Sequence, residues 1–284
     1  MLDIKWIKDN SEDFEDLLAK RGVKIDVDEL LGLYEEKKQL ATLIQQFQKA
    51  RNEKSKRLAS FKGEKNSDFE TVKRDVEHIN EKLAQLMKED QEINGLNEIL
   101  NNIPNLPASD VPYGTDESMN KLVKSHLEPK EIKNAREHND LGKALGVMDF
   151  EQTAKISGSR FVTLKGDLAR LQRALISFMI DIHTSEFGFN ELSTPVIVRP
   201  EAMFNVGQLP KFAHESYETH GGDFRLIPSG EVTLTNMVAK MILKRESLPM
   251  RMVAYTECFR SEAGSAGRDT KGMIRNHQFG KVEL

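Results

Sequence analysis

Arginine, carboxylate and aromatic side chains alternate along the segment 255–284. Two runs with a period of two residues flank a stretch rich in Gly, Ser, Asp and Thr, which predicts two antiparallel strands joined by a loop. The period gathers these side chains on a common face of the strand pair: Cys258, Arg260, Glu262, Arg275, His277, Phe279, Lys281 and Glu283. Guanidinium groups bind phosphate and an aromatic ring can lie against a purine, so this face suits a flat anionic ligand better than an apolar core. On patterning alone, a solvated outer face is the alternative.

The composition limits the class of protein. With 284 residues the chain is long enough for two domains, and 30 % charged against 38 % hydrophobic residues is typical of a soluble protein with a highly charged part. The net charge of −4 gives no global positive excess, so any nucleic-acid site must be local. The single cysteine, Cys258, excludes an intrachain disulfide and suits a reducing compartment. No signal peptide or membrane-spanning run is present, so we expect a cytoplasmic protein without a membrane partner.

Residues 1–103 make up the first predicted domain. Residues 1–26 have the pattern of a short docking segment with one helix start and stop. From 27 to about 103, apolar residues recur at spacings of three and four in two long stretches, which is typical of a coiled-coil seam. A turn at 62–68 separates the stretches and predicts an antiparallel hairpin whose arms, at about 1.5 Å per residue, reach roughly 50 Å. The predicted seam residues are Leu30, Leu33, Leu40, Ile44, Phe47, Leu58 and Phe61, then Phe69, Val72, Val76, Ile79, Leu83, Leu86, Ile93 and Leu100.

Positive charge is concentrated toward the predicted tip of this hairpin. Between residues 49 and 65, seven lysines and arginines stand against two glutamates. A solvated coiled-coil surface would explain such a run, whereas its place on a projecting arm favours a polyanion partner. The candidate side chains are Lys49, Arg51, Lys54, Lys56 and Arg57, together with Lys62 and Lys65 in the turn.

Three prolines mark a linker at 104–114, and the second predicted domain occupies 115–284. Within it, 161–164 has the pattern of a strand and 166–186 that of an amphipathic helix. The residues predicted to form the buried side of this helix are Leu168, Leu171, Leu175, Phe178 and Met179.

The segment 259–283 closely resembles motif 2 of the class II aminoacyl-tRNA synthetases, in the form found in bacterial-type seryl-tRNA synthetases. The matching pieces are Phe259-Arg260-Ser261-Glu262-Ala263-Gly264, Gly267-Arg268-Asp269-Thr270, and Arg275 through His277-Gln278-Phe279 to Lys281-Val282-Glu283. A match of this length and spacing is far more specific than a lone glycine motif.

Two further segments resemble the same family. The segment 188–195 looks like motif 1 with its closing proline, which in class II enzymes makes the dimer interface. The segment 207–212 also matches, although Asn205-Val206 precedes it where a Gly-Thr pair is usual. The N-terminal hairpin is similar to the helical arm with which this family grips the long variable arm of serine tRNA.

The segment 226–232 occupies the place of the family's serine-recognition loop. The family pattern is Thr, a small residue and Glu, whereas this chain has Ser229, Gly230 and Glu231. Ser229 keeps a hydroxyl that can bind substrate but lacks the β-branch that stiffens Thr. Gly230 adds backbone freedom. The departure therefore bears on serine affinity or selectivity.

The fold class that follows is α+β, with an antiparallel coiled-coil arm followed by a class II antiparallel-sheet catalytic domain. The third motif of the class, a strand and a glycine-rich helix with an ATP-binding arginine, has no match in the sequence. The resemblance therefore implies an incomplete catalytic domain, belonging to an N-terminal fragment or a truncated gene product. Such a chain is expected to bind tRNA through its arm and to lack serine-dependent ATP–pyrophosphate exchange.

The resemblance implies the reaction of a serine–tRNA ligase. Serine and ATP, with Mg²⁺ on the phosphates, would form seryl-adenylate. The seryl group would then pass to the 3′ end of serine tRNA, and also of selenocysteine tRNA, on a homodimeric enzyme. The alternative is a synthetase-derived module that binds tRNA or dimerises without catalysis.

The roles of individual residues are carried over from the matching motifs. Arg260 is expected at the α-phosphate and the serine carboxylate, Glu262 on the adenine side and Arg275 at the γ-phosphate, which makes these three the catalytic set. The ATP-binding set is Arg260, Ser261, Glu262, Arg275 and Phe279, with Phe279 stacked on adenine. The serine-binding set is Ser229, Gly230, Glu231, Arg260 and Glu283. The loop 264–270 would sense ATP and the tRNA acceptor end, and no side chain is expected to bind a metal.

Overall fold

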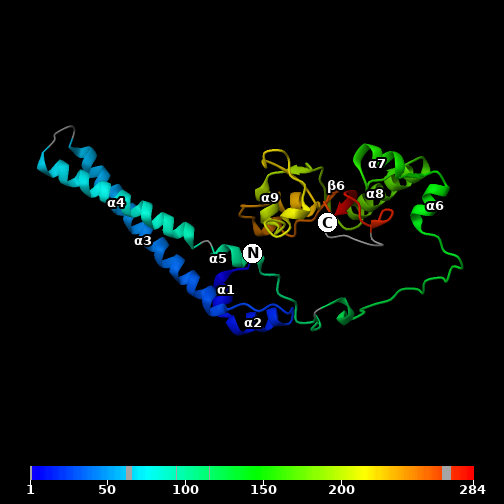
Figure 1. Cartoon of the computed structure of the whole chain (residues 1–284), viewed down its shortest axis with the longest axis horizontal. Coiled ribbons are helices and arrows are strands. Elements are labelled where there is room, and N and C mark those ends of the chain that lie inside the picture. Colours follow the sequence, from blue (N-terminus) through cyan, green and yellow to red (C-terminus); the bar gives the residue numbers. More distant parts are fainter. Residues whose placement is uncertain (1, 62–65, 94, 115, 264–269) are drawn as a thin grey trace. The chain divides into compact units, whose positions relative to one another are not determined.

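The computed structural model describes residues 2–61, 66–93, 95–114, 116–263 and 270–284. The chain divides into two compact units, Met1–Leu127 and Glu128–Leu284 (Figure 1). The first unit is helical, and the strands of the described residues all lie in the second.

A long helical hairpin forms most of the N-terminal unit. Helix α3 (Val27–Ser60) runs outward and α4 (Ser67–Glu92) returns beside it, antiparallel (Figure 1). Each helix begins at a polar N-cap residue. A carboxylate oxygen of Asp26 accepts a backbone N–H group from the first turn of α3, and the amide oxygen of Asn66 does the same for α4. These caps fix where the helices start and therefore where the chain reverses.

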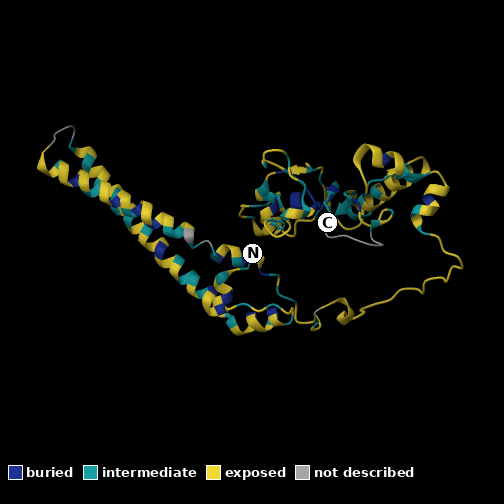
Figure 2. Ribbon diagram, in the orientation of Figure 1, coloured by how far each residue is buried: buried dark blue, intermediate teal, exposed yellow. Residues whose placement is uncertain are grey.

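Apolar residues hold the two helices together along one seam. Figure 2 shows the outer sides of both helices exposed, with the buried residues between them. Where the chain reverses, the rings of Phe61 and Phe69 meet edge to face at 5.9 Å between centroids. The buried seam residues are Leu40, Val72, Ile79, Leu83 and Leu86. The predicted coiled-coil hairpin is therefore confirmed.

The second arm of the hairpin is not one helix to residue 103, as the sequence pattern predicts. Helix α4 ends at Glu92, because Ile93 leaves the helical region with φ −79° and ψ 26°. Gly95, a residue of low helix propensity, then opens the separate helix α5 (Gly95–Asn102). The break lets α5 turn its apolar face into the core at the base of the arm.

This basal core joins α5 to two short N-terminal helices. They are α1 (Ile4–Asp9) and α2 (Ser11–Ala19), so residues 1–26 contain two helices where the sequence pattern predicts one. The buried cluster consists of Ile7, Phe14, Leu18, Val27, Leu30, Leu96, Leu100 and Ile103. Beyond α5 the described residues have irregular structure as far as Glu137, except for a 3₁₀ turn at Glu117–Met119, so irregular structure continues well past the predicted linker.

The C-terminal unit is organised around a three-stranded sheet. Strand β6 (Met252–Phe259) pairs antiparallel with β7 (Gln278–Glu283), as the alternating pattern predicts. Strand β3 (Asn190–Glu191), from the segment that resembles motif 1, joins the other edge of β6 in parallel. The sheet is therefore mixed at this edge.

Two small strand pairs lie outside this sheet. Strand β1 (Met148–Asp149) pairs with β2 (Thr163–Leu164), and β4 (Ile197–Val198) with β5 (Arg225–Leu226), both antiparallel. The helices of the unit are α6 (His138–Ala144), α7 (Glu151–Ser157), α8 (Asp167–Ser185), α9 (Pro200–Asn205) and α10 (Glu231–Asn236), with 3₁₀ turns at Ala213–Glu215 and Arg245–Ser247. A core of Val198, Met203, Ile227 and Val232 packs beneath the segment that leads into α10.

Helix α8 forms where the sequence predicts it, but the face predicted to be buried is largely exposed. Leu171, Leu175, Phe178 and Met179 are 52 %, 50 %, 59 % and 39 % exposed. The apolar spacing is helical, yet no element of the described chain covers this stripe, which is why periodicity alone misassigned it. Among the described residues no helix combines the length and apolar character needed to cross a membrane.

Candidate active site

The register of β6 and β7 places three polar or aromatic side chains of the motif-2 segment on one face of the sheet. Phe279 lies opposite Cys258, Lys281 opposite Thr256 and Glu283 opposite Ala254. Because alternate residues of a strand point to the same side, Phe279, Lys281 and Glu283 share a face. This part of the predicted face is confirmed.

Arg260, Glu262 and Arg275, by contrast, lie beyond the strand ends rather than on the strands. Strand β6 ends at Phe259, and Glu262 takes a left-handed conformation with φ 48°, which ends the alternation. Strand β7 begins only at Gln278, so Arg275 belongs to the chain leading into it. Arg260 still joins the hairpin, since its N–H donates to the His277 carbonyl at 3.0 Å.

The side chain of Arg260 is held between the hairpin and the segment before α10. Its Nε donates to the Pro228 carbonyl oxygen at 3.2 Å, and its guanidinium carbon lies 5.2 Å from the centroid of the Phe279 ring. A cavity of about 200 Å³ opens beside it, lined by Gln208, Phe212, Glu215, Ser216, Pro228 and Arg260. The two residues expected to meet the α-phosphate and adenine are therefore neighbours.

Glu262 and Arg275 form an ion pair at the edge of this region. A guanidinium nitrogen of Arg275 lies 3.7 Å from Glu262 Oε2. The Glu262 side chain is only 10 % exposed, whereas that of Arg275 is 49 % exposed. The backbone carbonyl of Glu262 also accepts a hydrogen bond from Arg160 at 2.8 Å. The cation is thus open to solvent while its carboxylate partner is fixed.

Ser261 uses both its hydroxyl and its backbone to hold the chain. Its Oγ donates to the His214 carbonyl oxygen, and its N–H donates to that of Glu215, each at 2.8 Å. The hydroxyl is therefore engaged with the 3₁₀ turn that lines the cavity, and Ser261 fixes the backbone beside Arg260.

A compact polar cluster forms at the other end of the shared face. Ser229 Oγ donates to Glu283 Oε2 at 2.6 Å, and Lys281 Nζ lies 2.6 Å from the same oxygen. Lys281 also donates to Ser229 Oγ at 3.0 Å. Burial acts to raise the pKa of Glu283, but the hydrogen bonds from Lys281 and Ser229 outweigh it and hold this pKa below its ordinary value. Glu283 is therefore a carboxylate.

Gly230 allows the loop to approach β7 this closely. A Cβ at this position would lie 2.9 Å from Glu283 Cβ and 3.2 Å from Thr256 Oγ1. The family has a small side chain at this position, whereas Gly230 has none. A methyl group here would push the loop away from Glu283. The loop and strand are in van der Waals contact because Gly230 has no side chain.

Glu231 is the first residue of α10, and its backbone hydrogen-bonds to the Glu283 carboxylate. Its Oε1 accepts a hydrogen bond from Gln208 Nε2 at 3.3 Å, and its side chain is exposed. Gln208 and Lys281 belong to segments that matched the family, yet sequence reasoning gave neither a role. The alternation of β7 was the signal for Lys281, since it lies between Phe279 and Glu283 on the same face.

His277 and Cys258 contribute to packing. The His277 ring lies 5.3 Å from that of Phe161 and 6.2 Å from that of Tyr217, and it lines a separate cavity rather than the one beside Arg260. Cys258 is buried, and burial raises the pKa of its thiol. Within the residues that the structure describes, no cluster of three or more His, Cys, Asp or Glu could hold a metal ion.

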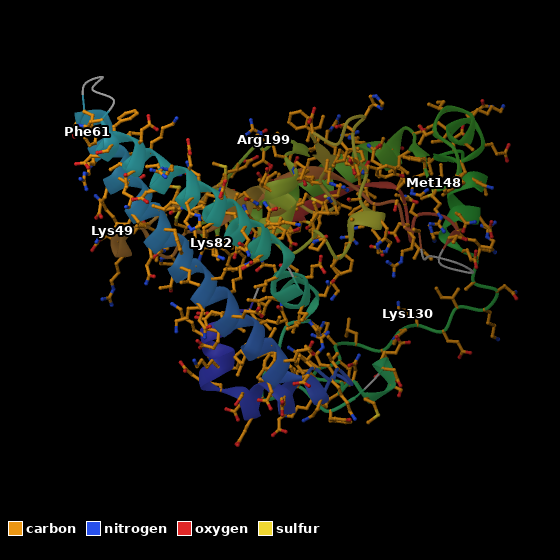
Figure 3. The ribbon with its side chains drawn as sticks, turned by 60° about the vertical axis from the view of Figure 1, so that its left-hand side comes forward. Lys49, Phe61, Lys82, Lys130, Met148 and Arg199 are labelled. Atoms are coloured by element: carbon orange, nitrogen blue, oxygen red, sulfur yellow. The ribbon has the colours of Figure 1, made fainter. Side chains whose placement is uncertain are left out.

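The basic side chains of the arm lie on α3, in the other unit. Figure 3 labels Lys49 and Phe61, which bracket this part of the helix. Lys54 is neutralised across the hairpin, because its Nζ lies 2.5 Å from Asp75 Oδ2, and Arg51 donates to Asn52. Lys49, Lys56 and Arg57 are exposed. Lys62, Lys65 and the residues 264–269 of the motif-2 loop lie outside the described residues.

Comparisons with known proteins find relatives that match this chain over its whole length. Residues 1–107 match the seryl-tRNA synthetase N-terminal domain, and residues 212–284 match the core domain of the class II tRNA synthetases for Gly, His, Pro, Ser and Thr. The serine–tRNA ligases of Rickettsia canadensis and Rickettsia akari are 57 % and 58 % identical over all 284 residues, which span 67 % of their own length.

Solved structures give the same result. The seryl-tRNA synthetase of Pyrococcus horikoshii, complexed with ATP, is 32 % identical and superposes with a TM-score of 0.78 over 99 % of this chain and 68 % of its own. The cytoplasmic serine–tRNA ligase of Naegleria fowleri, in complex with AMP, is 25 % identical with a TM-score of 0.74 over 99 % of this chain and 66 % of its own. The chain belongs to the seryl-tRNA synthetase family.

Proposed function

We propose that this chain provides the serine-, ATP- and tRNA-binding parts of a serine–tRNA ligase. The observation that carries the proposal is the placing of two complementary groups along one strand: Arg260 over Phe279 at one end, and Ser229 bound to Glu283 at the other. A cation beside an aromatic ring suits a nucleotide, and a carboxylate beside a hydroxyl suits an aminated hydroxy acid.

At the nucleotide end, adenine would stack on Phe279 while Arg260 meets the α-phosphate. The guanidinium is held by one hydrogen bond to the Pro228 carbonyl, so its remaining N–H groups can turn to phosphate oxygens. Arg275 is half exposed and would turn from Glu262 to the γ-phosphate, while Glu262 would face the adenine side. Ser261 would serve the nucleotide indirectly, by fixing the backbone next to Arg260.

At the serine end, Glu283 would bind the α-amino group and Ser229 the side-chain hydroxyl, with Glu231 at the rim. Because Lys281 already neutralises Glu283, the serine ammonium has to compete with an internal cation for that carboxylate. Gly230 would keep the loop close enough for the two ends to act on one small amino acid. This arrangement would hold serine with its carboxylate directed toward Arg260.

The reaction that follows is an in-line displacement on phosphorus. A carboxylate oxygen of serine forms a bond to the α-phosphorus while the bond to the oxygen bridging the β-phosphate breaks, and pyrophosphate leaves. The terminal ribose hydroxyl of the tRNA then attacks the seryl carbonyl carbon and AMP leaves. Mg²⁺ would arrive with the triphosphate of ATP, held by phosphate oxygens and water. Arg260 and Arg275 supply positive charge where the phosphate oxygens gain negative charge.

The arm would bind serine tRNA, and selenocysteine tRNA by the same contacts, through Lys49, Lys56 and Arg57. These side chains are exposed on a projecting hairpin and suit contacts with backbone phosphates, whose strength depends on salt. Lys54 and Arg51 would contribute less, because each already has a polar partner.

The uncovered stripe on α8 supports a homodimer. Leu171, Leu175, Phe178 and Met179 follow the helical spacing of a buried face and yet are exposed. A second copy of the chain would bury this stripe by a two-fold contact, in which the same patch serves both partners. A cytoplasmic location completes the proposal, since the lone cysteine, buried Cys258, is a free thiol.

Binding of a non-hydrolysable seryl-adenylate analogue tests the catalytic half of the proposal. Calorimetry should show one analogue bound per chain. The alanyl counterpart should bind at least roughly tenfold more weakly, because it lacks the hydroxyl that Ser229 would bind. Equal affinity for the two analogues, or no binding of either, would contradict it. If serine tRNA is bound while neither analogue is, the alternative of a non-catalytic tRNA-binding module is favoured.

A further inference from the structure

The chain just after the motif-2 loop is attached to the start of helix α6, far away in sequence. The backbone N–H of Met273 donates to His138 Nε2 at 2.8 Å. Next to it, Lys271 Nζ lies 3.7 Å from Glu137 Oε2. Two consecutive residues at the start of α6 therefore hold residues 271–273, which lead from the loop into Arg275 and β7.

The hydrogen bond defines the chemical state of the imidazole. A backbone N–H can only donate, so Nε2 of His138 must present its lone pair. The ring is therefore neutral, with its proton on Nδ1. A protonated imidazole has donors at both nitrogens and would repel the Met273 N–H instead of accepting it.

Gly272 fits the His138 ring in a way that no other residue could. Its φ of 63° lies in the left-handed region that glycine adopts without strain. A Cβ at this position would overlap with His138 Nε2 and the adjoining ring carbon. The backbone at Gly272 thus passes directly against the exposed imidazole, and a side chain at this position would displace the ring.

The attachment lies close to the nucleotide end of the site. Met273 is two residues before Arg275, whose guanidinium meets Glu262, and four before His277, whose N–H donates to the Arg160 carbonyl at 3.1 Å. The segment 273–277 is therefore fixed at one end by His138 and at the other by Arg160. The direction in which Arg275 leaves the backbone depends on both supports.

We propose that His138 is a positioning residue for the second motif, whose neutral Nε2 fixes the backbone at Met273 and thereby places Arg275 for the triphosphate. The first half of this inference concerns the hydrogen bond alone. The second half rests on the proposed function, since it assigns Arg275 to ATP.

Amide hydrogen exchange of the 284-residue chain, read by mass spectrometry on a peptide containing Met273, measures the attachment directly. Three substitutions distinguish the effect of the hydrogen-bond acceptor from the effect of the aromatic ring. His138→Gln places an amide oxygen where Nε2 lies, His138→Phe keeps a ring without an acceptor, and His138→Asn ends where Nδ1 lies. We expect Gln to retain the protection of the wild type and Phe and Asn to lose it by roughly tenfold or more, the scale of one neutral hydrogen bond.

A surface control completes the test. Lys271→Ala, which removes only the exposed ion pair, should change protection little. Unchanged exchange in α8 and β6 shows that each variant is folded. Full protection of the Met273 peptide in His138→Phe would overturn the inference.

ATP affinity then separates this inference from the proposed function. Given ATP binding by the wild type, we expect His138→Phe to bind ATP several-fold more weakly and His138→Gln to bind like the wild type. Equal affinity in His138→Phe, with Met273 released, would overturn the positioning of Arg275. Absence of ATP binding by the wild type would contradict the proposed function, and the exchange result would still decide whether His138 holds Met273.

Discussion

The contacts that stabilise the helical arm internally differ in kind from those that stabilise the catalytic unit. In the arm, buried apolar residues recur along one seam between α3 and α4, so each contact is supported by similar ones above and below it. In the catalytic unit, functional side chains depend on single hydrogen bonds between segments distant in sequence, such as Arg260 to Pro228 and Ser229 to Glu283. A repeated contact can be lost at small cost, whereas a single one has no substitute. Single substitutions should therefore have large effects on the site and small ones on the arm.

The largest effect is expected at Arg260. Replacing it with Ala removes the cation beside Phe279 and leaves the Pro228 carbonyl without its donor. We expect the affinity for a seryl-adenylate analogue to fall by roughly 30- to 1,000-fold, about 2–4 kcal/mol, as for other charged groups that pair with a bound charge. Calorimetry with the purified chain measures this.

Arg251→Ala is the matched control for this substitution. Arg251 lies just before β6 on the same segment and is exposed, so its loss should leave the affinity unchanged. Arg260→Lys should recover little, because an ammonium lacks the forked donors that can bind Pro228 and a phosphate at once. Near-normal affinity in Arg260→Ala would mean that the adenylate lies elsewhere.

The next effect concerns the exposed stripe of α8, where the catalytic unit lacks the self-contained packing of the arm. Phe178→Asp places a charge in the middle of the proposed two-fold contact, and should raise the dimer dissociation constant at least roughly tenfold because burying an unpaired charge is costly. Analytical ultracentrifugation measures this.

Ser177→Asp introduces the same side chain one residue away, about 100° around the helix axis and off the apolar stripe, and should leave the dimer intact. A monomeric wild type, or dissociation of equal size in the two variants, would show that the stripe on α8 is not the dimer contact.

How much of the fold could be predicted follows the same division. The spacing of Leu40 on one helix and Val72, Ile79, Leu83 and Leu86 on the other specified the seam, because a coiled coil repeats one local rule. The same rule predicted one continuous helix past Ile93, because the apolar spacing continues into α5. A single change of backbone conformation at Ile93 ends α4 there. Periodicity gave the contacts within a helix pair but not the point where the base of the arm interrupts them.

In the catalytic unit, alternation predicted the strands β6 and β7 and the shared face of Phe279, Lys281 and Glu283. It did not predict that Arg275 and Glu262 leave the strands, because that depends on the left-handed backbone at Glu262 and on supports from Arg160 and His138. The contact of Ser229 with Glu283 joins residues 54 apart in sequence, and only the family resemblance brought them together. Long-range contacts of this kind have no local signal.

A third effect should appear in the pH dependence of the catalytic unit. The pKa of Glu283 is lowered in the folded chain, so its charged form stabilises the fold fully above the pKa of the unfolded state, about 4.3, and this stabilisation is lost as the pH falls through the lower, folded pKa. At neutral pH, Glu283→Gln should destabilise β7 by about 1 kcal/mol, since Lys281 and Ser229 lose a charged partner.

At about pH 3 and below, the wild type should approach the variant, because protonation removes the same charge. Urea unfolding read by amide exchange in β7 measures the difference at each pH. A difference between wild type and Glu283→Gln that stays constant from neutral to acid pH would show that the carboxylate charge does not stabilise the sheet.

The smallest effect is expected in the arm, at the pair Lys54–Asp75. The side chains of Lys54 and Asp75 are 41 % and 44 % exposed, so the ion pair should contribute less than about 1 kcal/mol to the stability of the hairpin. Its consequence for RNA binding is more informative than its stability. While Asp75 neutralises Lys54, that lysine should release few counterions on binding serine tRNA, whereas the exposed Lys56 and Arg57 should each change the slope of log affinity against log salt by about one.

Asp75→Asn keeps the size of the side chain and removes its charge, which frees Lys54 for a phosphate. We expect this variant to bind serine tRNA several-fold more tightly at low salt and with a steeper salt dependence than the wild type, and we expect Lys54→Ala to change both less than Lys56→Ala does. A salt titration of tRNA binding measures all four chains under the same conditions. If Lys54→Ala has as large an effect as Lys56→Ala, the pair with Asp75 does not persist in the complex. Lys54 would then bind tRNA together with Lys56 and Arg57, as the sequence alone predicts.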